Sequence, residues 1–233
     1  MDQLDRTPTQ SRGKLVAWLV FVGALTALSL GARLGDTNAP DDIAFRYSSS
    51  VAALLQYGLM LGVLLLIARG IPRRQAFALH RPESWPRALG LAGLALLTIY
   101  LTAYVYDRVL SLFGDWNPTE EQGLVPDKWD SSRAGAFVAF FFVVTFIGPA
   151  VEELAYRGLG VSLLMPYGSV VAVLVTGVLF GAVHGLVIVL LPLSVFGIVV
   201  GWLRVRTNSI YPPMLLHSTF NGTALIVSVT LLG

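Results

Sequence analysis

The chain alternates long apolar runs with short stretches that contain most of its charged residues. Seven runs are close to the length that a helix needs to cross a hydrocarbon core of about 30 Å. They cover residues 15–32, 47–68, 88–106, 134–150, 169–184, 186–203 and 211–232. The pattern therefore predicts an all-α, polytopic bundle of about seven (six to eight) transmembrane helices, organised as a single integral membrane domain over residues 1–233.

Some boundaries of these runs have more than one interpretation. The fourth run can continue past residue 150, because apolar residues follow Glu152 and Glu153. The fifth and sixth runs are joined with almost no loop at His184–Gly185, which fits a tight hairpin or one broken helix. The first run, of about 18 residues, is longer than the apolar region of a signal peptide, so we interpret it as a retained helix.

The composition narrows the class of protein. Hydrophobic residues make up 55% of the chain and charged residues only 13%, against roughly 25% charged in a soluble domain. The formal net charge is +2, and no basic stripe with interleaved aromatics indicates nucleic-acid binding. Cysteine is absent, which excludes disulfides, thiolate catalysis and cysteine-ligated metal. The lipid bilayer is thus an expected partner, and nucleic acid is not.

Basic residues between the runs predict the orientation in the membrane. Lys and Arg in short loops favour the cytoplasmic side. A cytoplasmic N-terminus places most of them there, namely Arg6, Arg12, Lys14, Arg69, Arg73, Arg74, Arg81, Arg87, Arg157, Arg204 and Arg206. The acid-rich loop 107–133 and the C-terminus then lie outside.

Few ionisable residues lie within the apolar runs, and all of them are in the C-terminal part. They are Glu152, Glu153, Arg157, His184 and His217, with the polar Asn221 beside them. Ionisable groups cost several kcal/mol inside a membrane and tend to mark function. This set is therefore the candidate site.

The first motif is Glu152-Glu153-x-x-x-Arg157. Consecutive helical residues point about 100° apart, so the two glutamates cannot have the same role. Glu153 and Arg157 have the i, i+4 spacing of an ion pair. Glu152 has no local cation, and a carboxylate alone in an apolar pocket is a good proton acceptor and donor. Pro149 removes a backbone hydrogen bond just before the pair. The alternative is that both glutamates end the span at the cytoplasmic interface.

Two further motifs lie on later runs. Phe180 and His184 share a helix face. Stripes of small residues that permit close helix packing lie beside them and on the next run, at Gly177, Gly181 and Gly185 and at Gly197 and Gly201. His217 and Asn221 present two hydrogen-bond donors on one face, and such a pair can stabilise an oxyanion. The alternative for each motif is a simple interhelical hydrogen bond.

Together the three motifs resemble those of the CPBP family of intramembrane proteases. That family includes the Rce1-like type II CAAX prenyl endopeptidases and bacterial proteins once grouped as abortive-infection (Abi) or bacteriocin-immunity proteins. Its pattern, E-E-x-x-x-R, F-x-x-x-H and H-x-x-x-N, matches residues 152–157, 180–184 and 217–221 in order. The resemblance covers roughly residues 137–228, and we predict a catalytic core over residues 134–228.

The resemblance implies an endopeptidase that hydrolyses a peptide bond of a membrane-associated protein or peptide. Glu152 and His184 would activate the attacking water, and His217 and Asn221 would form the oxyanion pocket. Structural support would come from Glu153, Arg157 and Phe180.

The sequence does not decide whether the protein binds a metal cofactor. Glu152, His184 and His217 could hold a divalent ion such as zinc with an open water position. No H-E-x-x-H motif is present, and we favour a metal-free mechanism.

Other functions fit parts of the pattern. A non-catalytic membrane partner or immunity protein could retain the motifs as architecture. A proton-coupled transporter also uses intramembrane carboxylates and histidines, but here the polar groups cluster and form no file through the bundle. The short, Ala/Gly-rich chain is similar to a bacterial member, which predicts the bacterial cytoplasmic membrane and a substrate that need not be prenylated.

The two motif histidines differ in depth along their predicted runs. His184 comes about 15 residues into the fifth run and His217 about six into the seventh, so straight helices rising 1.5 Å per residue do not place them level. Their convergence with Glu152 is a prediction on which the enzyme hypothesis depends.

Overall fold

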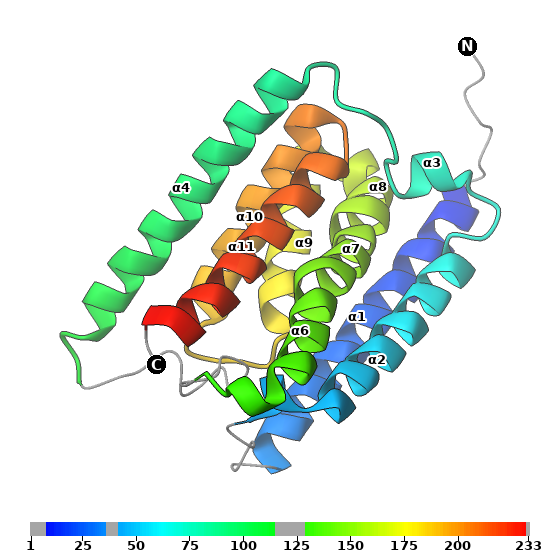
Figure 1. The fold of residues 1–233 in the computed structure, drawn as a ribbon. Helices are drawn as coiled ribbons and strands as arrows, with labels where there is room; N and C mark the ends of the chain where they lie inside the picture. Colours follow the sequence, from blue (N-terminus) through cyan, green and yellow to red (C-terminus); the bar gives the residue numbers. More distant parts are fainter. Residues whose placement is uncertain (1–7, 36–41, 115–128, 232–233) are drawn as a thin grey trace.

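The computed structural model describes residues 8–35, 42–114 and 129–231, and within these ranges it contains helices and no strands (Figure 1). The long helices are α1 (Pro8–Gly35), α2 (Tyr47–Ile67), α4 (Trp85–Leu110), α10 (Leu190–Thr207) and α11 (Tyr211–Leu231). A short helix, α3 (Arg73–Ala76), connects α2 to α4. The predicted all-α fold class is confirmed. Arg6 and most acidic residues of the loop 107–133 lie outside the described residues.

Five helical stretches of the described residues are long and apolar enough to cross a membrane. They are Arg12–Leu34, Tyr47–Ile67, Trp85–Leu110, Ser131–Tyr167 and Leu190–Thr207. The helix α9 (Ser169–Ala182) is apolar but shorter, and α11 carries the third motif. Large apolar side chains such as Leu28, Leu55 and Leu97 are exposed on α1, α2 and α4, as lipid-facing residues are. The chain is an integral membrane protein.

The fourth predicted run continues past residue 150 to form one long central stretch. It contains α6 (Ala134–Phe142), α7 (Gly148–Glu153) and α8 (Val161–Leu164), and it ends in the turn Met165–Tyr167. Two π-helical segments, Val143–Ile147 and Leu154–Gly160, separate the three helices. Glu152 and Glu153 lie inside this stretch, so the helix continues past both glutamates, as the fourth run allowed.

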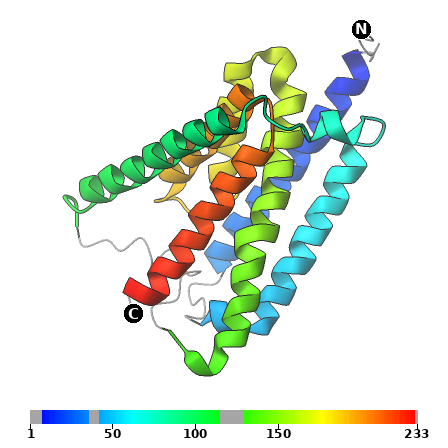
Figure 2. The ribbon, with the colours of Figure 1, turned by 45° about the horizontal axis from the view of Figure 1, so that its top comes forward.

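Side chains from other helices donate hydrogen bonds to backbone carbonyls in both π-helical segments. Pro149 has no N–H, and its ring crowds the carbonyl of the preceding turn, which a widened turn relieves. The Asn221 side-chain amide on α11 donates to the Val144 carbonyl at 3.0 Å, and the Trp18 indole on α1 donates to the Ala155 carbonyl at 3.0 Å. Polar side chains thus satisfy backbone groups that have no water partner in a bilayer. They also fix α1 and α11 against the central stretch, beside which α11 runs in both views (Figures 1 and 2).

The predicted junction between the fifth and sixth runs is wrong. The helix α9 ends at Ala182 and α10 begins at Leu190, so residues 183–189 form a connection. The sequence pattern predicts runs that end at residue 184 and begin again at residue 186, with almost no loop. Gly185 turns the chain there with φ +67°, a conformation that glycine adopts without strain. A Cβ on Gly185 would lie 2.9 Å from the backbone of Ser29 on α1. The connection is therefore packed against α1.

Small residues set the distance between α9 and α10, as the glycine stripes predicted. A Cβ on Gly177 would lie 2.6 Å from the Ile198 backbone nitrogen, and one on Gly197 would lie 2.7 Å from the Gly177 Cα. The backbones can approach this closely only because both residues lack side chains. This contact holds the second motif beside α10.

Candidate active site

Glu152 lies between three helices and is partly accessible. The Tyr57 hydroxyl on α2 donates to Glu152 Oε1 at 2.9 Å. On the other side, Nε2 of His217 on α11 lies 3.7 Å from Glu152 Oε2, and the Glu152 side chain is 19% exposed. The predicted carboxylate without a local cation therefore has a phenol and an imidazole as its neighbours.

Glu153 is fully buried and has a different set of partners. Its Oε1 accepts a hydrogen bond from Arg157 Nη1 at 2.9 Å and lies 2.8 Å from His217 Nδ1. Arg157 Nη2 also donates to the Gly197 carbonyl at 3.0 Å, and the guanidinium lies 4.5 Å from the centre of the Phe180 ring. The predicted Glu153–Arg157 pair is confirmed, and the two glutamates have separate surroundings as helix geometry requires.

The contact between His217 and Glu153 fixes the histidine's tautomer. A carboxylate oxygen only accepts hydrogen bonds, so the Nδ1 atom that faces it carries the hydrogen. The Nε2 atom, which faces Glu152, is then the lone-pair nitrogen of the neutral ring. His217 thus connects the buried glutamate to the accessible one.

His184 lies two residues beyond α9, in a turn and not within a span. Its Nδ1 is 2.7 Å from the Phe180 carbonyl, which accepts the hydrogen bond, so Nε2 is again the lone-pair nitrogen. The Phe180 ring centre lies 4.9 Å from the His184 ring and 5.6 Å from the His217 ring. Both imidazoles therefore contact one aromatic ring, although their residue counts along the chain predicted different depths.

Asn221 takes part in an interhelical hydrogen bond. Its Nδ2 donates to the Val144 carbonyl, which is the alternative that the sequence left open for this residue. An amide nitrogen carries two hydrogens, so one remains for another acceptor.

The described residues do not fit the three-ligand metal site that the sequence suggested. Glu152 and His217 approach each other, but no group of three His, Cys, Asp or Glu side chains within the described ranges is arranged to hold a metal ion. We therefore derive no step through a metal.

Tyr57 is the contact that sequence reasoning missed. It lies on α2, far from the three motifs in sequence, and a tyrosine in an apolar run resembles an interfacial anchor. Gly148 provides the room for it, since a Cβ there would lie 2.7 Å from the Tyr57 hydroxyl oxygen. A glycine directly before Pro149 was the one local signal, and it does not identify its partner.

The fold and these contacts define a class of protein: a helical membrane bundle with two carboxylates, an arginine and an imidazole in contact inside it. Residues 134–223 match the family of Rce1-like type II CAAX prenyl endopeptidases. The matched segment contains all three motifs and confirms the resemblance to the CPBP proteases. The search of curated proteins and the search of solved structures found no match.

Proposed function

We propose that this protein is an intramembrane endopeptidase in which Glu152 activates the attacking water. The observation that carries the proposal is the difference between the two glutamates. Glu153 is fully buried and ion-paired, whereas Glu152 is partly accessible and lies between a hydroxyl donor and an imidazole. A general base needs access to its substrate water and a neighbour that can share a proton.

The hydrolysis follows from this arrangement. Glu152 takes a proton from water while the water oxygen bonds to the scissile carbonyl carbon, and the carbonyl electron pair moves onto oxygen. His184 would orient the water through its lone-pair Nε2. When the tetrahedral intermediate collapses, the C–N bond breaks and Glu152 returns the proton to the leaving amine.

His217 and Asn221 would stabilise the oxyanion. Asn221 has a second amide hydrogen for this purpose. His217 would donate from Nε2 as an imidazolium, because Nδ1–H is already held by Glu153. The buried Glu153 carboxylate accepts the Nδ1–H and orients the ring, as a buried carboxylate does beside the histidine of a catalytic triad. Tyr57 acts as a positioning residue that holds Oε1, so that Oε2 faces His217.

The substrate would be a membrane-associated protein or peptide, and the active-site face would open toward the cytoplasm. The family name points to substrates with prenylated C-terminal segments. The small, apolar chain favours a bacterial membrane, where the substrate need not carry a prenyl group. The basic end of the bundle, which includes Arg69 and Arg87, would face the cytoplasm.

The test is a comparison of protein C-termini in membranes from cells that produce the wild type or Glu152→Gln at equal levels. We expect a set of termini that depends on Glu152, since loss of a general base lowers turnover about 10²- to 10⁴-fold. The same fragments are then tested as synthetic peptides, with and without a prenyl group, on the purified protein.

The matched control is Asp107→Asn, the same carboxylate-to-amide change at a partly exposed position paired with Arg108. It should leave the termini unchanged. Identical termini in wild-type and Glu152→Gln membranes would instead favour a non-catalytic membrane partner.

A further inference from the structure

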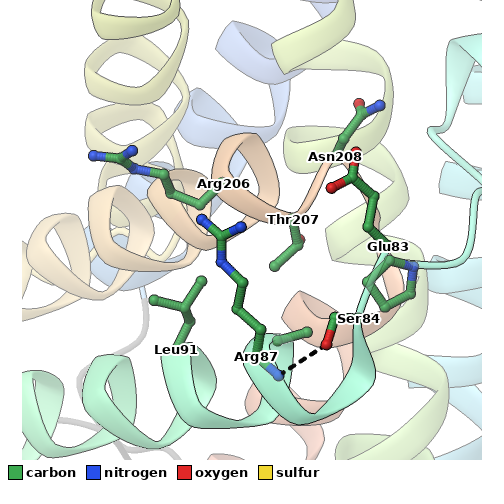
Figure 3. A pocket seen from close by; sticks show the side chains of 9 residues that line it. Glu83, Ser84, Arg87, Leu91, Arg206, Thr207 and Asn208 are labelled. Atoms are coloured by element: carbon green, nitrogen blue, oxygen red, sulfur yellow. Dashed lines mark hydrogen bonds between the residues drawn. The ribbon is translucent and has the colours of Figure 1, made fainter.

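A small recess of about 70 Å³ lies where the start of α4 meets the end of α10 (Figure 3). Its polar lining comes from Glu83, Ser84 and Arg87 on the α4 side and from Arg206, Thr207 and Asn208 on the α10 side. Figure 3 shows Arg87 extending from α4 toward α10. None of its lining residues belongs to the three motifs, and the recess has no part in the proposed hydrolysis.

The two arginines of the recess have no acidic partner. Neither Arg87 nor Arg206 forms an ion pair with any carboxylate of the described residues, although Glu83 lines the same recess. Arg206 lies over the Trp202 ring at 5.7 Å, a contact that positions the guanidinium without neutralising it. The first turn of α4 adds the partial positive charge of a helix N-terminus. The recess therefore has an excess of positive charge.

A buried arginine, Arg204, is hydrogen-bonded to Asn208, one of the residues that line the recess. Arg204 is only 7% exposed, and its Nε has no hydrogen-bond partner within the described part of the chain. Its Nη1 donates to the Asn208 side-chain oxygen at 3.3 Å, so the amide group of Asn208 is left with its NH₂ as donor. A buried guanidinium without a carboxylate is costly, and an anion in the recess would offset that cost.

The surrounding surface has the same sign of charge. Among described residues, this end of the bundle has one acidic side chain, Glu83, and many basic ones, at Arg12, Lys14, Arg69, Arg73, Arg74, Arg81, Arg87, Arg204 and Arg206. Burial and the charges of Arg74 and Arg204 together lower the pKa of His80 nearby. Trp85, exposed at the first position of α4, is a residue type enriched at the membrane interface.

We propose that this recess binds the phosphate of an anionic glycerophospholipid headgroup. The guanidinium groups of Arg87 and Arg206 would hold the phosphate oxygens, for which arginine is well suited. The Asn208 NH₂ would donate a further hydrogen bond. Because the recess lies at the ends of two membrane-spanning helices, a lipid of the adjoining leaflet can reach it without leaving the bilayer.

The experiment is a native mass spectrometry titration of the full chain in detergent with phosphatidylglycerol and, separately, with phosphatidylcholine. We expect tighter binding of phosphatidylglycerol by the wild type. The double substitution Arg87→Gln/Arg206→Gln should weaken that binding about 30-fold, since each cation near an anionic lipid contributes about fivefold.

The matched control is Arg69→Gln/Arg73→Gln, which removes two charges from the same end outside the recess. It should change the affinity only about twofold, as expected of exposed charges that act at a distance. Equal losses of affinity in the two double variants would overturn the proposed lipid site, because general electrostatic attraction to the surface would then explain the binding. Arg87→Lys/Arg206→Lys keeps the charge but loses the bidentate geometry, and it should give an intermediate affinity.

A competition arm distinguishes the lipid from free phosphate. Inorganic phosphate is added to the complex of wild type and phosphatidylglycerol. Retention of the lipid in millimolar phosphate supports the proposal, and complete displacement would assign the recess to free phosphate and overturn it.

Discussion

Two buried arginines, Arg157 in the central stretch and Arg204 at the basic end, have opposite electrostatic surroundings. Both are almost inaccessible, and in both the Nε atom has no hydrogen-bond partner among the described residues. Arg157 has a carboxylate, a carbonyl and an aromatic ring around it. Arg204 has one amide oxygen. Among the residues that the structure describes, one buried cation is thus neutralised internally and the other has no counterion.

This difference in charge compensation indicates a separate function for each region. Around Arg157 the buried charges balance, so the surroundings of Glu152 can stay fixed without an external partner. Around Arg204 no carboxylate of the described residues balances the charge, and the neighbouring recess offers an anion a place beside it. Substitutions at Glu153, at the Tyr57–Gly148 contact and at Arg204 test this difference, with expected effects that decrease in that order.

The largest effect is expected from Glu153→Ala. This substitution leaves Arg157 charged and without its carboxylate in a buried position, and it removes the acceptor for His217 Nδ1. Breaking a buried ion pair from one side costs about 3–5 kcal/mol, so we expect a large loss of thermal stability in detergent together with loss of activity.

The control for Glu153→Ala is Asp107→Ala, which breaks the exposed pair with Arg108. The freed arginine stays in water there, and the melting temperature should not change measurably. A Glu153→Ala protein as stable as the control would mean that Arg157 does not depend on Glu153.

A smaller effect, on catalysis alone, is expected from Tyr57→Phe. A hydrogen bond to a charged group contributes about 1.5–3 kcal/mol, so kcat should fall about 10- to 100-fold with little change in KM or in melting temperature. Gly148→Ala should have a similar effect, because its Cβ displaces the Tyr57 hydroxyl.

Gly135→Ala provides the matched control for that displacement. A Cβ on Gly135 would lie 2.5 Å from the hydroxyl of Tyr47, so it displaces a tyrosine in the same way but away from Glu152. Activity should be retained. If Gly135→Ala lowered kcat as much as Gly148→Ala, the contact between Tyr57 and Glu152 would have no special role.

The smallest effect, and one of opposite sign, is expected from Arg204→Met. Replacement of an uncompensated buried charge by an apolar side chain is neutral or stabilising, here by up to about 1 kcal/mol. The melting temperature of lipid-free protein in detergent should therefore stay constant or rise, and added phosphatidylglycerol should stabilise this variant less than the wild type. A loss as large as that of Glu153→Ala would show that Arg204 is already compensated within the chain.

Much of the fold could be predicted from apolar periodicity and run length, since a bilayer demands helices of one length. The helical class, the continuation of the fourth run past Glu152 and the close contact of Gly177 with Gly197 all followed from local pattern. The connection of residues 183–189 did not, because its residues are as apolar as the helices it joins. Only Gly185 marked the turn, and its left-handed backbone is not visible in composition.

The candidate site was predictable where spacing along one helix determines contact. The pair Glu153–Arg157 is of this kind. The hydrogen bonds of Tyr57 and His217 to the two glutamates were not predictable, because they join helices whose relative rotation is set by packing. Predicted depth failed for a related reason, since residue counts along tilted helices of unequal length do not measure position across the bundle.

The two π-helical segments have a consequence for how this site tolerates insertions and deletions. Each wide turn holds one residue more than a regular helical turn. The extra residue rotates the side chains that follow it by about 100° around the helix axis. Removal of one residue from Val143–Ile147 would restore ordinary helical hydrogen bonding yet rotate α7 as a unit. Glu152 would then turn away from α2, with every motif residue still in place in the sequence. Alignments of this region that allow no gap inside the helix would compare side chains that point in different directions.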